Sequence, residues 1–454
     1  MDSPQLKQEN NLLFKQILNR KYFTPMKEGR RRPHIELFLS ASCPSNCSYC
    51  YLKKHQNELY PLACDNHELI IKNTASFLDY YIQEEFRATL EIFSAECIGN
   101  NLMFDVWDLI YTKFSVVDPF FRPDNILIAD NFDFINSEEL TNKVQSYIDK
   151  FKAMGIRLSL SASVDGKYMD VNRNKEHADE YYKKLFDFCI KNNYLVHPMI
   201  SANNIELWKE NYLWYMENAP EHIVWRLGAL EVRDDNWTDD KLEAYSDFLR
   251  FVINYELEHH HNNDLTSFTH RVFGANDIAR TYDVLYIPWR DEDNHAKLGC
   301  SAQKNFVVRM GDLAIVRCHR TSYEDFVGGY FITDDNGKII DIEAKNIAYY
   351  LGTLAWTYMN APQCSDCLYR KICMGPCIGS NYESTNSSFL TAPSVCSMLK
   401  IKNLTLLMEY EHMGILDIAK TINKIHPDRV KACEEVLEFY KKGLTTHGFG
   451  TPVR

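Results

Sequence analysis

Residues 43–50 read CPSNCSYC and place Cys43, Cys47 and Cys50 at a C-x3-C-x2-C spacing. The run before them, residues 35–40 (IELFLS), alternates apolar and polar side chains as a half-buried strand does. The cysteines therefore follow the C-terminal end of a predicted strand, which is the functional edge of an α/β barrel. Three thiolates are informative, because a structural zinc site uses four protein ligands. Three leave one iron of a four-iron cluster open to a ligand that is not protein.

The stretch from Ser42 to Tyr51, with an aromatic residue just before the third cysteine, resembles the cluster loop of the radical S-adenosylmethionine (SAM) superfamily. The resemblance implies that the amino and carboxylate groups of SAM chelate the open iron, and that reductive cleavage of SAM gives a 5'-deoxyadenosyl radical. It also implies that Tyr49 lies near the adenine, the alternative being that Tyr49 only packs. A chance match or a zinc site remains the alternative for the triplet taken alone.

Length and composition limit the class of protein. A chain of 454 residues is too long for one ordinary core, so we expect one large and one smaller domain. The net charge of −12 argues against a nucleic-acid partner. No stretch approaches the roughly 20 apolar residues of a membrane span, and the start lacks a signal peptide. We therefore expect a cytoplasmic protein without a membrane partner, whose 14 cysteines are metal ligands rather than disulfides.

Short β-rich runs alternate with longer amphipathic stretches between residues 34 and about 258. The runs are residues 34–41, 89–94, 125–130, 156–163, 195–201 and 224–232. This alternation predicts an α/β fold with a parallel sheet and right-handed crossovers. Six units are fewer than the eight that close a complete barrel, and the resemblance implies a partial (β/α)6 barrel.

The clearest helix is predicted to begin at Asn136, with Glu139 three residues later as in a capping box, and to stop at Gly155. One face of it carries Leu140, Val144, Ile148 and Phe151. A second helix is predicted from Asp428 to Tyr440, just after Pro427.

Two strand ends carry residues that the family resemblance assigns to SAM. After the second strand, residues 93–96 read FSAE where the family usually has Gly-Gly-Glu, so Ser94 and Glu96 are expected to meet the amino group of SAM. After the fourth strand, residues 163–166 read SVDG, as in the family's Ser-x-Asp-Gly turn. By the same resemblance, Ser163 and Arg173 would contact the ribose and carboxylate of SAM. The alternatives are a solvated strand end and a plain turn.

A second group of cysteines has the spacing C-x2-C-x5-C-x3-C, followed by one more cysteine after eighteen residues. These are Cys364, Cys367, Cys373, Cys377 and Cys396, with Cys300, Gly311 and Cys318 upstream. Together they resemble the SPASM domain, which holds two auxiliary four-iron clusters in radical SAM enzymes that act on peptides and proteins.

The resemblance implies how these ligands divide between the two auxiliary clusters. One cluster would be held by Cys364, Cys367, Cys373 and Cys396, and the other by Cys300, Cys318 and Cys377. The second set has three evident cysteines, so its fourth iron is open, held by another residue or bound by a substrate thiolate. A zinc site in this region is the alternative. No role is assigned to Cys64, Cys97, Cys189 and Cys433.

The chain is predicted to divide into five parts. These are an N-terminal helical extension (1–33), the partial barrel (34–258), a bridge (259–299), a SPASM auxiliary-cluster domain (300–415) and a C-terminal helical tail (416–454).

The function that this resemblance implies is peptide maturation. We expect a radical SAM oxidoreductase that abstracts hydrogen from a ribosomally made peptide (RiPP biosynthesis) and forms a thioether cross-link. The alternatives are a sulfatase maturase that makes formylglycine, a maturase that forms carbon–carbon cross-links or epimerises residues, and a zinc-stapled interaction protein without enzymatic activity. No catalytic acid or base is assigned, because many carboxylates at the barrel edge qualify.

The expected partners are a peptide or protein substrate and an electron donor such as flavodoxin or ferredoxin. The 42 residues before Cys43 are fewer than the leader-binding domain that many peptide-maturing relatives carry. A separate leader-binding protein is therefore expected to present the peptide, unless the substrate is recognised in another way.

Overall fold

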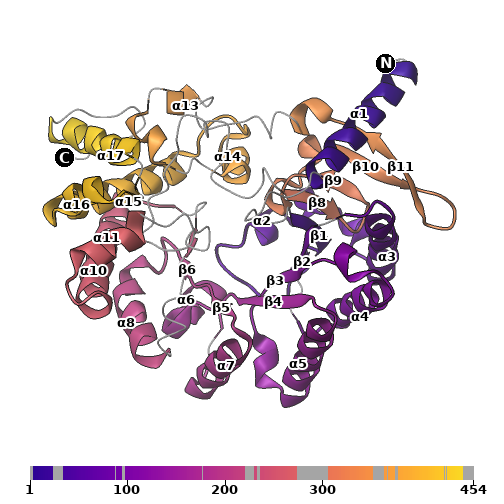
Figure 1. Ribbon diagram of the computed structural model, residues 1–454, viewed down its shortest axis with the longest axis horizontal. Coiled ribbons are helices and arrows are strands. Elements are labelled where there is room, and N and C mark those ends of the chain that lie inside the picture. The colour runs from indigo at the N-terminus through magenta and orange to yellow at the C-terminus, as the bar shows by residue number, and fades with distance from the viewer. Residues whose placement is uncertain are drawn as a thin grey trace. The chain divides into compact units, whose positions relative to one another are not determined.

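The structure is a computed structural model (Figure 1). It describes residues 4–23, 34–86, 88–94, 98–175, 177–219, 230–232, 236–273, 305–350, 362–365, 367–373, 377–423, 425 and 427–442. The chain divides into two compact units. The first unit comprises Met1–Val164, His177–Leu195 and Ser301–Leu354, and the second comprises Asp165–Glu176, Val196–Cys300 and Ala355–Arg454.

The first unit contains a nine-stranded sheet in the order β11-β10-β9-β8-β1-β2-β3-β4-β5. Its parallel barrel-type part comprises β1 (His34–Ser40), β2 (Thr89–Ser94), β3 (Asn125–Asp130), β4 (Arg157–Ala162) and β5 (Leu195–Val196). The pairs β1–β2, β2–β3 and β3–β4 are all parallel, as strands joined by helical crossovers must be. The predicted α/β fold of partial-barrel type with a cysteine-rich C-terminal part is confirmed, and the C-terminal part adds antiparallel strands that the sequence analysis did not predict.

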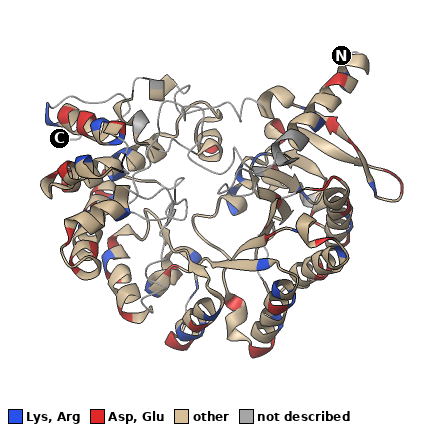
Figure 2. Cartoon of the chain, viewed as in Figure 1, with Lys and Arg blue, Asp and Glu red and all other residues tan. Residues whose placement is uncertain are grey.

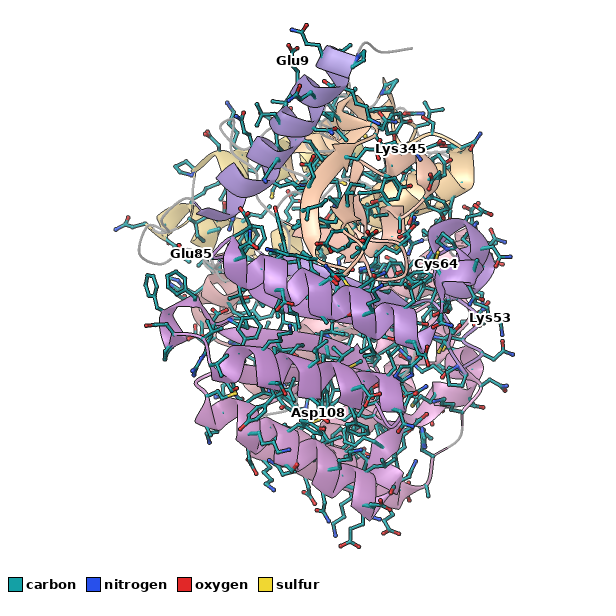
Figure 3. The ribbon with its side chains drawn as sticks, turned by 90° about the vertical axis from the view of Figure 1, so that its right-hand side faces the viewer. Glu9, Lys53, Cys64, Glu85, Asp108 and Lys345 are labelled. Atoms are coloured by element: carbon teal, nitrogen blue, oxygen red, sulfur yellow. The ribbon has the colours of Figure 1, made fainter. Side chains whose placement is uncertain are left out.

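Helices connect these strands. They are α2 (Tyr51–Leu59), α3 (His67–Gln83), α4 (Asn101–Ser115), α5 (Glu138–Ala153) and α7 (Asp179–Asn192). Of these, α3, α4 and α5 lie on one side of the sheet (Figure 1). Figure 3 shows α3, α4 and α5 lying side by side. Each buries an apolar stripe, as Phe77 on α3, Trp107 on α4 and Phe151 on α5 illustrate, since all three are fully buried.

The N-terminus of α5 differs from the prediction by one residue. Ser137, not Asn136, is the N-cap, and its hydroxyl accepts a hydrogen bond from the Leu140 N–H at 3.3 Å. Asn136 instead ends a short 3-10 helix, η3 (Asp133–Asn136). Serine and asparagine are comparable caps, so sequence alone did not separate the two neighbours. The predicted stop is confirmed, because Gly155 follows the helix with a φ of +77°.

Strand β1 is more deeply buried than its alternating sequence predicted. Every residue from Ile35 to Ser40 is buried, including Glu36, which is 1% exposed. The reason is that β1 lies between β2 and β8, and a segment far along the chain covers its second face through His319. The expectation of a half-buried strand was therefore wrong.

The strands that extend the sheet beyond β1 come from the cysteine-rich half of the sequence. They are β8 (Asn305–Arg309), β9 (Ala314–Val316), β10 (Gly329–Thr333) and β11 (Ile339–Ala344). Strand β8 pairs in parallel with β1, whereas β8–β9, β9–β10 and β10–β11 are antiparallel. Helix α1 (Pro4–Phe23) packs on the edge strand β11 (Figure 1), where Asn11 accepts a hydrogen bond from the Ala344 N–H at 2.8 Å. The predicted five-part division of the chain is not tested by these observations and stays a prediction.

The second unit is mainly helical. Its helices are α6 (Met169–Arg173), α8 (Trp208–Asn218), α10 (Asp239–His260), α11 (Leu265–Phe273), α13 (Pro362–Ser365), α14 (Ile378–Thr385), α15 (Pro393–His412), α16 (Ile415–Thr421) and α17 (Pro427–Lys441). Helices α10 and α15 pack together through residues such as Ser246 and Thr405, whose hydroxyls lie 2.8 Å apart. Helix α17 matches the helix predicted from Asp428 to Tyr440.

The fifth predicted strand is split in the structure. Residues 195–201 form β5 and, after His197 and Pro198, a separate strand β6 (Met199–Ile200). Strand β6 pairs in parallel with β7 (Leu230–Glu231) in a sheet of its own. Proline has no N–H for a strand ladder, which accounts for the break. Most of the sixth predicted run, residues 224–229, lies outside the described residues.

No helix within the described part of the chain is long and apolar enough to span a membrane. Lysine, arginine, aspartate and glutamate lie side by side along the outer helices, α5 and α7 among them (Figure 2). The helix surfaces therefore carry both signs of charge rather than the basic face that nucleic-acid binding requires.

His197 makes the stability of the second unit sensitive to acid. Burial lowers the pKa of His197 to about 4, from its usual value near 6.5. In the unfolded chain the imidazole takes up a proton near pH 6.5, so unfolding is favoured as the pH falls from 6.5 towards 4.

We predict that between pH 7 and pH 5 the wild-type chain loses about 2 kcal/mol more unfolding free energy than His197→Gln. Urea denaturation at the two pH values measures the difference. Equal losses for the two proteins would contradict the prediction.

Candidate functional site

The predicted cluster loop, residues 43–50, leaves the C-terminal end of β1 and leads into α2. Cys43 is exposed, and Cys47 and Cys50 are half-buried. The loop is tightly turned, because the Cys50 N–H donates to the Cys47 carbonyl at 3.2 Å and the Ser45 N–H donates to the Cys43 Sγ at 3.4 Å. The three thiols therefore sit on one short turn at the edge of the sheet that the sequence indicated.

Asp65 anchors the start of this loop. Its Oδ2 accepts hydrogen bonds from the hydroxyl of Ser40 at 3.1 Å and from that of Ser42 at 2.6 Å. Tyr60 adds a second tie, since its hydroxyl donates to the Leu39 carbonyl at 2.6 Å. Sequence reasoning did not identify Asp65, because an aspartate in a loop carries no signal for a partner more than twenty residues away.

Arg309 at the end of β8 and Gly311 in the turn after it both contact the segment that follows the cluster loop. Arg309 is 1% exposed, and its Nη1 donates to the Leu59 carbonyl at 3.2 Å. Gly311 lies against Cys64, and a Cβ at position 311 would come within 2.6 Å of the Cys64 carbonyl oxygen and 2.7 Å of the Tyr60 hydroxyl. The glycine of the second cysteine pattern is thus explained by close backbone approach.

We predict that Gly311→Ala lowers the free energy of unfolding by about 1–3 kcal/mol, because the added methyl group overlaps a backbone carbonyl that cannot rotate away. Urea denaturation measures the change. An unchanged midpoint would show that the turn has room that the structure does not indicate.

Tyr51, the first residue of α2, lies close to cysteines from both halves of the sequence. Burial raises the pKa of Tyr51 well above its usual value, and the nearby thiols of Cys318 and Cys50 act in the same direction. Cys318 directly precedes the 3-10 helix η9 (His319–Thr321). The structure therefore brings Cys318 and Cys50 near one aromatic residue.

The predicted SAM contacts are placed as follows. Ser94 is half-buried at the end of β2, Ser163 is half-buried just after β4, and Tyr49 is half-buried in the cluster loop. Arg173 is buried in α6 of the second unit. Glu96 lies outside the described residues.

Arg173 is oriented by a carboxylate that the sequence analysis did not assign. Its Nε and Nη2 donate to Asp165 at 2.9 and 3.4 Å, and Asp165 is 1% exposed. Asp165 also accepts from the Met199 N–H at 2.8 Å, and its carbonyl accepts from Asn211 at 2.7 Å. The SVDG turn therefore holds a charge-assisted pair. Its spacing to Arg173 was the only sequence signal for this pair.

Asp130 fixes the turn at the end of β3. Its carboxylate accepts from the N–H groups of Ile98 and Phe132, each at 2.6 Å. Phe132 has a φ of +60°, a left-handed conformation that is costly for an aromatic residue. A glycine would adopt this conformation without strain. In this chain the hydrogen bonds to the Asp130 carboxylate stabilise it instead.

Four of the five cysteines of the second group gather in the second unit. Burial raises the pKa of Cys364 to about 12, and the neighbouring thiols of Cys373, Cys396 and Cys367 contribute in that order. Burial likewise raises the pKa of Cys396 to about 11, with Cys373 and Cys367 again close by. These four are the residues that the resemblance assigned to one auxiliary cluster.

Lys400 supplies a positive charge to this four-thiol group. It lies one helical turn after Cys396 on α15 and is only 2% exposed. Its ammonium group lowers the pKa of both Cys396 and Cys364, against the effect of burial. A buried ammonium beside thiols favours thiolates, which are the form that binds iron. Sequence analysis missed Lys400, although its spacing of four residues from Cys396 was a usable signal.

The remaining cysteines are less completely placed. Cys377 is half-buried at the N-cap of α14, and Cys300 lies outside the described residues. Within the ranges that the structure describes, no group of three or more His, Cys, Asp or Glu side chains is arranged to hold a single metal ion. The histidine run 259–261 serves other contacts, such as stacking of His259 on Tyr255 with ring centres 3.9 Å apart.

Solved structures share this architecture of a parallel α/β sheet of partial-barrel type, continued by antiparallel strands and a cysteine-rich segment. Three structures of one protein, anSMEcpe, match this chain: the native protein with bound AdoMet and a Cp18Cys peptide, the polyhistidine-tagged protein with AdoMet, and the native protein with AdoMet. Each has a TM-score of 0.52 and 13% sequence identity, and the match covers 86% of this chain and 100% of that one. At this identity the likeness concerns the fold. No protein-family model and no curated protein sequence matches the chain.

Proposed function

We propose that this chain is a radical SAM enzyme that modifies a peptide or protein. The observation that carries the proposal is the position of Cys43, Cys47 and Cys50, which leave the C-terminal end of β1 in a fold shared with anSMEcpe. Structures of that protein hold AdoMet, and one also holds a peptide.

In this proposal the cysteines divide into three groups of iron-sulfur ligands. Cys43, Cys47 and Cys50 would hold the SAM-binding cluster, and the four-thiol group beside Lys400 would hold one auxiliary cluster. The other auxiliary cluster would take Cys300, Cys318 and Cys377. When bound, the reduced first cluster supplies the electron that cleaves SAM, and the resulting radical removes hydrogen from the substrate.

The chain's own residues bind SAM and orient the substrate in this proposal. Ser94 and Glu96 would accept from the amino group of SAM, Ser163 would meet the ribose, and Tyr49 would lie near the adenine. Arg173 would contact the SAM carboxylate, and its pair with Asp165 supports that role because it leaves the guanidinium with one defined direction.

The reaction that we propose is formation of a thioether cross-link in a ribosomally made peptide. A C–H bond and an S–H bond of the peptide break and a C–S bond forms. One hydrogen atom would go to the radical that SAM supplies, the thiol proton would go to solvent, and an auxiliary cluster would accept the remaining electron. The group of Cys300, Cys318 and Cys377 supports this choice, because three cysteine ligands would leave one iron of that cluster for a substrate thiolate. An external donor such as flavodoxin or ferredoxin would supply the first electron, and a separate protein would present the leader of the peptide.

Formation of formylglycine in a sulfatase is the second candidate function. The fold match favours it, because anSMEcpe is an anaerobic sulfatase maturase. Carbon–carbon cross-linking and epimerisation use the same radical step and are distinguished by the product.

We predict that replacing Cys43, Cys47 and Cys50 together by alanine abolishes reductive production of 5'-deoxyadenosine, because no site for the SAM-binding cluster remains. The assay uses anaerobically reconstituted protein with SAM and dithionite, followed by chromatography. Cys433→Ala, which removes a fully buried cysteine without an assigned role, is the matched control and should keep activity. Deoxyadenosine from the triple variant at the wild-type rate would overturn the proposal.

Metal analysis separates the enzyme from a zinc-stapled interaction protein. We predict iron together with acid-labile sulfide after anaerobic purification. A colourless protein with stoichiometric zinc and no sulfide would favour the interaction protein.

The mass of the product formed from a cysteine-rich peptide distinguishes the possible reactions. Loss of two hydrogens without a free thiol indicates a thioether, an aldehyde-trapped product indicates formylglycine, and solvent deuterium at one Cα indicates epimerisation.

A further inference from the structure

The buried carboxylate of Glu36 has no part in the chemistry proposed above. It lies on β1 and is 1% exposed, and its Oε1 accepts a hydrogen bond from Nδ1 of His319 at 2.7 Å. A buried carboxylate is costly unless it is paired. His319 comes directly after Cys318, so this pair joins the strand that leads to the cluster loop with a proposed ligand of the second cysteine group.

Stacking holds the His319 ring in the remaining directions. The ring of Phe93 lies parallel to it, with centroids 3.8 Å apart and planes 6° apart. Tyr51 stacks more distantly, with ring centroids 6.1 Å apart and planes 27° apart, and the Arg320 guanidinium lies 4.3 Å from the centre of the Tyr51 ring. The hydrogen bond fixes one edge of the imidazole, and the two aromatic neighbours limit its tilt.

The residue before Cys318 is fixed as well. Arg317 is 2% exposed, its Nη1 donates to the Tyr350 hydroxyl at 3.1 Å, and its guanidinium lies 5.0 Å from the centre of the Tyr350 ring. Cys318 itself has extended backbone, with φ −157° and ψ 144°. Cys318 is therefore held between two anchored neighbours.

We propose that Glu36 and His319 form a positioning pair that fixes Cys318 near Tyr51 and the cluster loop, within the first unit. This inference rests on the proposed function in one respect, namely that Cys318 is a cluster ligand. The pair touches neither the substrate nor SAM in this account, and its effect is on the assembly of the cluster that Cys318 holds.

The test removes the SAM-binding cluster first, so that only the auxiliary clusters are read. In a background with alanine at Cys43, Cys47 and Cys50, iron and sulfide per chain and the electron paramagnetic resonance spectrum are measured after anaerobic reconstitution. Cys318→Ala in this background defines the loss of one cluster. Glu36→Leu and His319→Phe should lose iron and signal to the same level, because neither retains the hydrogen bond.

Two further variants separate positioning from general loss of the carboxylate. Glu36→Gln should keep the iron content of the background, since its amide oxygen accepts from Nδ1 as the carboxylate does. Glu91→Gln is the matched control and should also keep it, because Glu91 lies beside Glu36 on β2 but its own hydrogen bond, at 3.4 Å, is to His34. Should either of these variants not fold, Glu36→Leu combined with His319→Phe decides, because the double variant leaves no unpaired buried carboxylate and the Phe ring can keep the contacts with Phe93 and Tyr51.

Full iron and an unchanged spectrum in His319→Phe, with loss in Cys318→Ala, would overturn the positioning pair and leave the proposed function intact. Full iron in Cys318→Ala would overturn the assignment of Cys318 as a ligand, and with it this inference. Neither result depends on deoxyadenosine production, which tests the proposed function separately.

Discussion

Pairing of β1 on both of its edges is the constraint on which the first unit depends. Strand β1 is hydrogen-bonded in parallel to β2 on one side and to β8 on the other. Strand β2 is the next strand of the parallel sheet, whereas β8 comes from the cysteine-rich half of the sequence. A strand paired on both edges has little freedom to shift, because a slip of one residue would exchange its two faces. The cluster loop therefore leaves from a fixed point.

Buried ion pairs occur where loops of this chain need a fixed direction. Asp165 holds Arg173 in the second unit, and in the first unit Arg309 is bonded to Asp312 at 2.8 Å through its Nε. Such pairs contribute little net stability relative to apolar residues of similar size, but breaking one of them is costly. Their benefit in this chain is directional, because each pair orients a guanidinium or a loop beside a predicted site.

The sequence predicted the repeating part of the fold, and it failed where distant segments meet. Parallel strands and the α17 helix follow from local periodicity, and the gathering of Cys364 with Cys396 follows from a recognisable spacing. The burial of Glu36 could not be predicted, because it depends on His319, 283 positions away. The one-residue error at Ser137 and the break in the fifth strand at Pro198 are local. Two adjacent residues of comparable capping strength could not be separated by sequence, and the proline was included in a strand that it interrupts.

The antiparallel strands β8–β11 also serve as a cover for the edge of the parallel sheet. A fragment of this protein that ended before residue 305 would leave the second edge of β1 with unpaired N–H and C=O groups along an apolar strand. Exposed edges of this kind recruit strands from other chains and lead to aggregation. The barrel half of the molecule is therefore not a self-sufficient module. The edge of β1 can be paired only after the last third of the chain has been synthesised. The nascent chain must therefore be kept from aggregating until then.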